Sequence, residues 1–168
     1  MLVYKNVQTL SEINQVRQLA SIIWNQHYPS IISQAQIDFM LDLMYSEAKI
    51  KTELESGRVF YELIYTDTAT EPIGYCSYHI KSEEQALFLS KLYILPDVHG
   101  QGYGKIALQH IEALALQHQM ASMYLFVNKA NIKATRAYER FGMIQEQSIV
   151  NDIGQGFVMD DYIYRKTF

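Results

Sequence analysis

The sequence predicts a single α/β domain built on a mostly antiparallel sheet with helices packed beside it. Runs of strand-forming residues alternate along the chain with stretches whose apolar residues recur every three or four positions. Neighbouring strand-like runs are joined in two places by short polar loops, which is typical of hairpins. The 168 residues are 49% apolar and 19% charged, so the chain can bury one full core, and we expect one domain over residues 1–168.

The first part of the chain predicts one strand and three helices. Residues 2–7 alternate as a strand does, and Thr9 or Ser11 can cap the helix that follows. The apolar face of this helix consists of Ile13, Val16, Leu19, Ala20, Ile23 and Trp24. Ser33 can cap a second helix, and a third, short helix is expected over residues 48–54. The apolar face of the second helix consists of Ile37, Met40, Leu41 and Met44.

The remainder of the chain predicts strands interrupted by two helices. The expected strands are residues 58–66, 72–81, 86–95, 123–127, 144–150 and 156–164. The expected helices are residues 103–119 and 131–141. Polar loops at residues 67–71 and 151–155 join the first and the last pair of these strands.

The composition narrows the classes of partner. With 14 Lys and Arg against 18 Asp and Glu, the net charge is −4 at pH 7, which argues against a nucleic-acid partner. No apolar run has the length of a membrane span and no signal peptide is recognisable, so we expect a cytoplasmic protein without a membrane partner. The single cysteine, Cys76, excludes a disulfide within the chain and is expected to be buried and inert. A homodimer is compatible with these properties.

Residues 92–106 carry the clearest chemical motif. A strand-like run stops at Pro96, glycines follow as Gly100, Gly102 and Gly104, and a helical pattern begins directly after them. A strand, a glycine turn and a helix start together present free backbone N–H groups and a positive helix end to an anion. Glycine also permits close approach and a positive φ. We therefore expect a diphosphate cradle here; the alternative is an ordinary tight turn.

The spacing of the glycines selects the kind of diphosphate loop. A dinucleotide fingerprint needs a glycine where this chain has Lys105, and a Walker loop needs four residues where Gly100 and Gly104 enclose three. The segment His99-Gly-Gln-Gly-Tyr-Gly104 resembles instead the acyl-CoA loop of the GNAT N-acetyltransferases, Gln/Arg-x-x-Gly-x-Gly/Ala. It departs from that pattern at His99, which holds the place usually taken by Arg or Gln.

A second motif strengthens the resemblance. Asn131-x-x-Ala134-x-x-x-Tyr138-x-x-x-Gly142-Met143 is similar to the other GNAT motif, whose last residue is usually Phe. The resemblance covers residues 73–166 and implies the GNAT acyl-CoA N-acyltransferase fold, in which helices flank a mostly antiparallel mixed sheet. The two motifs together are far more specific than either one alone.

The resemblance implies acetyl-CoA as cosubstrate, no metal, and a role for each part of the two motifs. The backbone at Tyr93, Ile94 and Leu95 is expected to pair with the pantetheine arm and the acetyl oxygen. The diphosphate is expected on the loop formed by His99, Gly100, Gln101, Gly102, Tyr103, Gly104 and Lys105. Asn131 is expected to cap a helix, to reach the CoA arm, or both. Tyr138 is expected as the acid that protonates the leaving thiolate, with a core tyrosine as the alternative.

The base that deprotonates the acceptor is left unassigned by the sequence. Many GNAT enzymes carry a carboxylate on the strand before the loop, but residues 86–94 contain none, and Ser90 and Lys91 stand in its place. The candidates elsewhere are His79, Asp160 and Asp161. A water chain, or an amine that arrives neutral, would need no dedicated base.

The acceptor is expected to be a primary amine on a small molecule, such as a polyamine-like amine. The candidate walls of its pocket are Trp24, His27, Tyr28, Phe39, Tyr75 and Tyr162, each of which can equally be core. Residues 156–162 resemble the closing segment of some bacterial GNAT proteins, including polyamine acetyltransferases, and aromatic rings beside carboxylates suit a cation. Two alternatives remain: a protein or peptide N-acetyltransferase, and a non-catalytic acyl-CoA-binding sensor.

Overall fold

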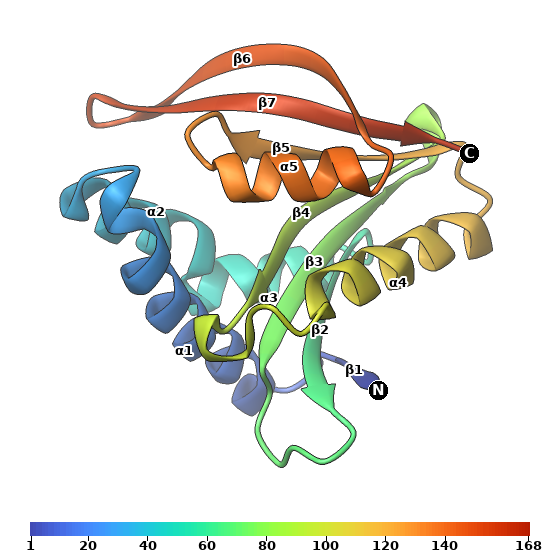
Figure 1. The fold of residues 1–168 in the computed structure, drawn as a ribbon. Helices are drawn as coiled ribbons and strands as arrows, with labels where there is room; N and C mark the ends of the chain where they lie inside the picture. Colours follow the sequence, from blue (N-terminus) through green and yellow to red (C-terminus); the bar gives the residue numbers. More distant parts are fainter. The chain divides into compact units, whose positions relative to one another are not determined.

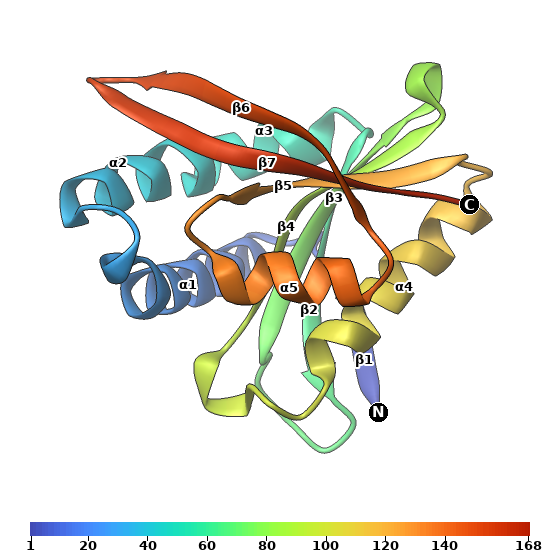
Figure 2. The same ribbon diagram turned by 45° about the horizontal axis from the view of Figure 1, so that its top comes forward.

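The computed structural model describes residues 1–168, and its helices and strands follow the predicted order (Figure 1, Figure 2). The elements are β1 (Leu2–Asn6), α1 (Leu10–His27), η1 (Tyr28–Ser30), α2 (Gln34–Tyr45), α3 (Glu47–Glu55), β2 (Val59–Thr66), β3 (Gly74–Lys81), η2 (Ser82–Glu84), β4 (Ala86–Ile94), η3 (Pro96–Val98), α4 (Tyr103–Gln117), β5 (Ser122–Asn128), α5 (Ile132–Arg140), β6 (Ile144–Gly154) and β7 (Phe157–Thr167), where η marks a short 3₁₀ helix. The predicted α/β class is confirmed.

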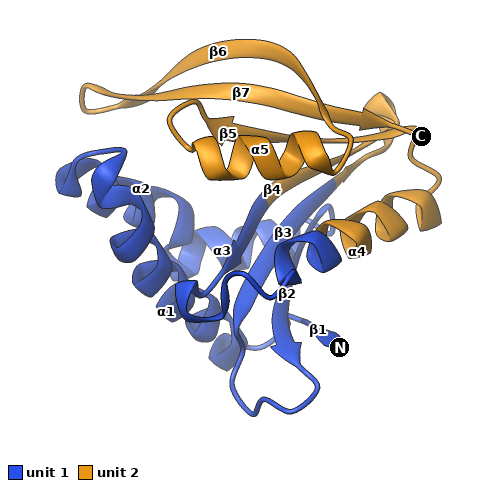
Figure 3. Cartoon of the chain, viewed as in Figure 1, with its two compact units in different colours: residues 1–79, 91–107 blue, residues 80–90, 108–168 orange.

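By their internal contacts the residues fall into two compact units (Figure 3). The first unit consists of residues 1–79 and 91–107 and contains α1, α2 and α3 with β1 and β2. The second unit consists of residues 80–90 and 108–168 and contains α5 with β5, β6 and β7. The elements β3, β4 and α4 each contribute residues to both units.

The strands follow the order β1-β2-β3-β4-β5-β7-β6. In the first unit β2 pairs antiparallel with β1 and with β3, and in the second unit β7 pairs antiparallel with β5 and with β6. Strands β4 and β5 run parallel, with Ala86 opposite Ser122 and Leu89 opposite Leu125. A parallel pair needs a long crossover, which α4 supplies. The sheet is therefore mixed and mostly antiparallel, as the sequence predicts.

The helix starts follow local capping chemistry. Thr9 caps α1 in a reciprocal capping box, in which its side chain accepts from the Glu12 N–H and the Glu12 carboxylate accepts from the Thr9 N–H. Ser33 caps α2 by accepting from the Gln36 N–H. Both caps were predictable because each satisfies a backbone N–H that the helix itself leaves unpaired.

Each unit has an apolar core made of residues that are distant in sequence. The largest fully buried side chains of the first unit are Trp24, Tyr61, Tyr75, Ile37, Ile50, Leu63 and Ile64. Those of the second unit are Leu87, Ile111, Met123, Leu125 and Tyr164. Cys76 is buried as predicted, and burial raises the pKa of its thiol well above the ordinary value, which keeps it unreactive. None of the helices combines the length and the apolar character needed to cross a membrane.

The closing hairpin differs from the sequence prediction. The loop predicted over residues 151–155 is wrong, because β6 continues to Gly154 and β7 begins at Phe157. The turn is made by Gln155 and Gly156, whose φ angles are +53° and +79°, and two successive positive φ angles suit a tight hairpin. Most residues of β6 are exposed, so they lack the alternation of apolar and polar residues by which a strand is recognised.

Candidate active site

The glycine loop lies where the motif places it, between η3 and the start of α4 in the first unit. The φ angles of Gly100 and Gly102 are +83° and +79°, a region that other residues rarely adopt. Residues 99–102 are exposed, so their backbone is open to a ligand. Gly104 differs from the other two glycines, because it lies inside α4 and has no positive φ. Of the three glycines, only Gly100 and Gly102 therefore need the special backbone freedom.

Five successive backbone N–H groups of this loop are unpaired. The N–H groups of Lys105 and Ile106 donate to the Gly102 carbonyl, at 3.1 Å and 3.2 Å, and so close the first turn of α4. The N–H groups from Gly100 through Gly104 donate to no acceptor in the protein. Exposed N–H groups at a helix start, with alternating positive φ, form a concave site of positive potential for an anion.

His99, the residue at which the loop departs from the GNAT pattern, connects the loop to the end of β4. Its Nε2 donates a hydrogen bond of 2.8 Å to the carbonyl oxygen of Ile94, the last residue of β4. The backbone N–H of His99 donates to the Pro96 carbonyl at 3.0 Å. The side chain at position 99 thus ties the loop to the strand before it. No sequence pattern signals this contact.

Gly74 sets the position of the backbone that the resemblance assigns to the pantetheine arm. A Cβ at Gly74 would collide with the Tyr93 carbonyl oxygen and would lie 3.1 Å from Ile94 Cα. The N–H of Leu95 donates to the Ile73 carbonyl at 2.8 Å, which holds the end of β4 against β3. Sequence reasoning missed Gly74, because a glycine at the start of a strand carries no motif of its own.

Replacing Gly74 by Ala is expected to lower the free energy of unfolding by about 1–3 kcal/mol, because overpacked backbone must shift. The same shift moves Tyr93 and Ile94, so the affinity for acetyl-CoA should fall as well. Urea unfolding and calorimetric titration measure the two effects. Gly104→Ala is the matched control for stability, since a Cβ there meets no atom within 4 Å and φ is not positive. If Gly74→Ala has the wild-type free energy of unfolding, β4 can shift to accommodate the methyl group without loss of stability, which would contradict the prediction.

Strands β4 and β5 pair over only part of their length. Their register ends at Leu89 and Leu125, although β5 continues to Asn128. Over the residues beyond Leu125, β5 remains paired with β7, up to Asn128 opposite Asp161. This end of β5 leads directly into the turn before α5.

The second motif lies in the second unit, on α5. Asn131 caps the helix by accepting from the Ala134 N–H at 3.3 Å. Tyr138 is half-buried, with its ring 6.2 Å from that of Tyr164. The buried residue of α5 is Thr135, whereas Ala137 is exposed. The cap predicted at Asn131 is confirmed, while the expected contacts of Asn131 and Tyr138 with CoA stay predictions.

An aromatic cluster in the first unit contains three of the predicted pocket walls. Trp24, Tyr28 and Tyr75 meet Tyr45 and Tyr93, with ring centroids 4.5 to 6.4 Å apart. Two hydrogen bonds join the hydroxyls, Tyr28 with Tyr93 at 3.0 Å and Tyr75 to Tyr45 at 2.8 Å. Burial raises the pKa values of Tyr45 and Tyr75 well above the usual value, so both stay neutral. The sequence did not single out Tyr45, the last residue of α2.

The remaining predicted positions are scattered. His27 is in edge contact with Tyr28, 4.8 Å between centroids, whereas Tyr162 belongs to the second unit. Phe39 is half-buried on α2. The predicted acceptor walls are therefore not one continuous group of residues within either unit.

Lys91, one of the two residues that stand where the resemblance implies a carboxylate, is buried. Its Nζ lies over the rings of Tyr45 and Tyr61, 5.5 Å and 5.3 Å from their centroids. Burial lowers the pKa of Lys91, and the nearby Glu53 raises it, with burial the larger effect. The Tyr61 hydroxyl donates to Glu53, which is half-buried, so the lysine, the tyrosines and the glutamate form one connected group. The neutral rings, and not a counter-ion in direct contact, surround this cation.

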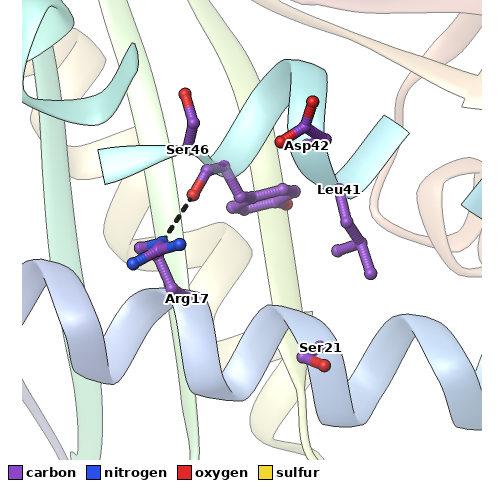
Figure 4. A pocket seen from close by; sticks show the side chains of 6 residues that line it. Arg17, Ser21, Leu41, Asp42 and Ser46 are labelled. Carbon is purple, nitrogen blue, oxygen red and sulfur yellow. Dashed lines mark hydrogen bonds between the residues drawn. The ribbon is translucent and has the colours of Figure 1, made fainter. Parts of the chain in front are cut away.

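A shallow pocket of about 250 Å³ opens between α1 and the end of α2 (Figure 4). Its lining consists of Arg17, Ser21, Leu41, Asp42, Tyr45 and Ser46. The Arg17 Nε donates to the Tyr45 carbonyl at 3.0 Å, drawn as the dashed line in Figure 4, and its Nη1 donates to Asn14. Both acceptors are uncharged, so the pocket presents the guanidinium of Arg17 as well as the carboxylate of Asp42 to a ligand. No group of three or more His, Cys, Asp or Glu side chains is arranged to hold a metal ion.

An exposed glycine turn before α4, a parallel strand pair that ends early and a capped α5 are the features expected of an acyl-CoA-dependent acyltransferase. The model of the acetyltransferase (GNAT) family matches residues 16–143, and the chain belongs to that family. The resemblance stated from the two motifs is therefore confirmed.

Individual relatives agree with this assignment. The chain is 32% identical over 77 residues to the peptidyl-lysine N-acetyltransferase YjaB of Salmonella typhimurium. The matched segment is 45% of this chain and 50% of YjaB, so the chain matches about half the length of this curated relative. The PaiA N-acetyltransferase of Thermoplasma acidophilum in complex with coenzyme A superposes with a TM-score of 0.82, at 19% identity over 100% of this chain and 99% of the other. The spermidine/spermine N-acetyltransferase SpeG of Vibrio cholerae superposes with a TM-score of 0.69, at 15% identity over 99% and 92%. At these identities the two structures show a shared fold.

Proposed function

We propose that this protein transfers the acetyl group of acetyl-CoA to a primary amine. The observation that carries the proposal is the run of unpaired N–H groups from Gly100 through Gly104, which suits the diphosphate of CoA. Because the chain belongs to the acetyltransferase family, we infer that the acyl donor is acetyl-CoA. The related structure of PaiA with coenzyme A supports the same ligand.

The proposed reaction needs few groups. The loop holds the diphosphate, and the backbone at Tyr93, Ile94 and Leu95 orients the pantetheine arm and polarises the acetyl carbonyl. The amine attacks the carbonyl carbon, and the C–S bond breaks. Tyr138 protonates the departing sulfur, because a phenol with an ordinary pKa near ~10 can donate to a thiolate.

For the acceptor we propose a small cationic amine, with a lysine side chain of a peptide or protein as the alternative. Within the first unit, the aromatic rings around Trp24 and the carboxylate of Asp42 suit a cation. SpeG, named for spermidine and spermine, supports the small molecule, whereas YjaB, named for peptidyl-lysine, supports the protein substrate. An acyl-CoA-binding sensor without catalysis is the remaining possibility.

Ligand identity is tested by thermal denaturation. Acetyl-CoA and CoA should raise Tm, since a ligand at 100 times its Kd stabilises the native state by about 2.7 kcal/mol. ATP and NAD, which share the adenine and phosphates but lack the pantetheine arm, are the controls. A Tm increase with NAD or ATP and none with acetyl-CoA would contradict the proposal.

Activity is tested by following thiol release from acetyl-CoA with a panel of amines. The panel contains spermidine, other small primary amines, Nα-acetyl-lysine amide and a lysine-containing peptide. We expect turnover with a small cationic amine. Preference for the peptide would favour the protein substrate, and binding of acetyl-CoA without turnover of any amine would favour the sensor.

A further inference from the structure

Asp161 of β7 is a buried carboxylate without a partner. The residue is 2% exposed, and its side chain makes no hydrogen bond and no ion pair. Its neighbour Asp160 is exposed and forms an ion pair with Lys129, whose charge is therefore already compensated. A buried carboxylate without hydrogen bonds destabilises a folded protein. Such a residue is more readily explained by function than by stability.

Asp161 and α5 lie on opposite faces of the second unit's strands. Side chains alternate along β7, so Tyr162 and Tyr164 point to one face and Asp161 points to the other. The first face is the one that α5 covers, because the Tyr164 hydroxyl donates to Glu139 at 2.9 Å and its ring contacts that of Tyr138. The proposed acid and the unpaired carboxylate are therefore separated by the thickness of the sheet.

Asp161 also lies at the end of β5 that leads to the second motif. It is directly opposite Asn128, the last residue of β5. The Asn128 carbonyl accepts from the Asn131 N–H at 2.9 Å, and its side-chain oxygen accepts from the Ala130 N–H at 2.9 Å. This tight turn holds Asn131, the residue that the family resemblance assigns to the CoA arm, close to the strand end that Asp161 faces.

We propose that Asp161 accepts the proton of the acceptor's ammonium group, directly or through one water, and that the acceptor is accordingly a cationic primary amine. This inference rests on the acetyltransferase function proposed above. The entering nitrogen and the leaving sulfur are bonded to the same carbon in the tetrahedral intermediate, but each needs its own proton-transfer group. Asp161 and Tyr138 lie on different faces of the second unit's strands, so they are assigned to different atoms of the intermediate.

The protons balance over the reaction. The ammonium transfers one proton to the Asp161 carboxylate, which leaves a neutral amine. The nitrogen lone pair then forms the C–N bond, the C–S bond breaks with its electron pair on sulfur, and the nitrogen loses its second proton. The thiolate takes one proton from Tyr138, which regains one from the nitrogen through solvent. Asp161 releases its proton to water, so one turnover releases one proton.

The acidity of Asp161 fits this role. Burial raises the pKa of Asp161 to about 6; the charge of Asp160 raises it too, and that of Lys129 lowers it. These are the charged groups that act on it, Asp160 from β7 and Lys129 from the turn after β5, whereas β6 places the apolar Ile149 opposite. A carboxylate with this pKa is ionised at neutral pH and is a stronger base than an exposed one.

The test is the pH profile of kcat/KM for Asp161→Asn, measured by thiol release with acetyl-CoA and the amine panel from about pH 5 to about pH 9. The wild type should lose activity as the pH falls through about 6. The variant should lose this acid limb, be slower by ~10²-fold at neutral pH, and recover at high pH, where the amine is already neutral. Acetyl-CoA affinity, measured by calorimetry, should be unchanged.

Two neighbouring variants distinguish catalysis from a general loss of charge. Asp160→Asn should keep kcat within a factor of a few and move the acid limb to lower pH, because a charge that raises the pKa of Asp161 is gone. Lys129→Gln should move the limb to higher pH for the opposite reason. If the acid limb of the kcat/KM profile lies at the wild-type pH in both variants, the assignment of that limb to Asp161 is wrong.

The stability of Asp161→Asn shows whether Asp161 has a structural role instead of a catalytic one. The folded-state pKa is raised, so the wild-type carboxylate destabilises the fold increasingly as pH rises from its unfolded pKa through about 6. Asp161→Asn should therefore be more resistant to urea than wild type at pH values above about 6, with the difference vanishing in acid. A variant that is less stable at every pH, or that keeps wild-type kcat at neutral pH, would overturn the proposal. Wild-type protein that binds acetyl-CoA but acetylates no amine would instead remove the proposed function, and this role with it.

Discussion

Gly102→Val is expected to weaken acetyl-CoA binding by roughly tenfold to a hundredfold while the protein stays folded. The φ of Gly102 is +79°, which a β-branched residue adopts only at a cost of about 1–3 kcal/mol. If the loop instead relaxes to an ordinary φ, the N–H groups turn away from the diphosphate. Each lost hydrogen bond to a charged group is worth about 1.5–3 kcal/mol, and 1.4 kcal/mol is a tenfold change in Kd.

Two matched glycines separate strain from ligand contact. Gly57 has a φ of +68° and, like Gly102, open space where a Cβ would lie, so Gly57→Val carries the same strain outside the loop. It should lose similar stability and keep wild-type acetyl-CoA affinity. Gly104→Ala should keep full stability, because Gly104 is helical. Its affinity for acetyl-CoA then shows whether the ligand approaches position 104 too closely for a methyl group. Calorimetric titration and urea unfolding measure these effects. Wild-type affinity in folded Gly102→Val would exclude the loop as the diphosphate site.

Tyr138→Phe is expected to lower kcat by ~10²-fold or more, with the Kd of acetyl-CoA little changed, because the change removes one hydroxyl and keeps the ring. The departing thiolate then leaves without a proton donor. If Tyr138 is only a packing residue against Tyr164, kcat should persist and stability alone should fall, by ~1 kcal/mol for one lost hydrogen bond.

The control for this substitution is Tyr124→Phe. Tyr124 also belongs to the second unit, and its hydroxyl contacts Glu84 at 3.4 Å, so the variant likewise loses one phenol hydroxyl. It should keep kcat within a factor of a few. The measurement is single-turnover and steady-state thiol release with any amine that the wild type acetylates. A kcat of Tyr138→Phe close to that of Tyr124→Phe would leave Tyr138 as packing.

Much of the fold was predictable because its signals are local. The helix caps at Thr9, Ser33 and Asn131 depend on a side chain and an N–H three residues away, and all three form as predicted. The strand ends were less predictable where burial is slight. The 11 residues of β6 are mostly exposed, so no apolar alternation marked residues 151–154 as strand.

The candidate site also has features that the local sequence predicts and features that only the tertiary structure shows. The positive φ angles at Gly100 and Gly102 follow from a local glycine pattern, and so did the expectation of an anion at this loop. The contact of His99 with the Ile94 carbonyl and the approach of Gly74 to Tyr93 involve backbone atoms, which no side-chain pattern encodes. They became visible only with the strands in place.

By itself, the sequence determined the family, the order of the elements and the glycine loop that we expect to bind an anion. These depend on neighbours within a few positions, where covalent geometry limits the possible conformations. Tertiary structure alone decided that Asp161 is buried and unpaired while the adjacent Asp160 is exposed and paired with Lys129. Burial and pairing depend on which distant residues are brought alongside, and two adjacent aspartates in a strand differ only in the face to which they point.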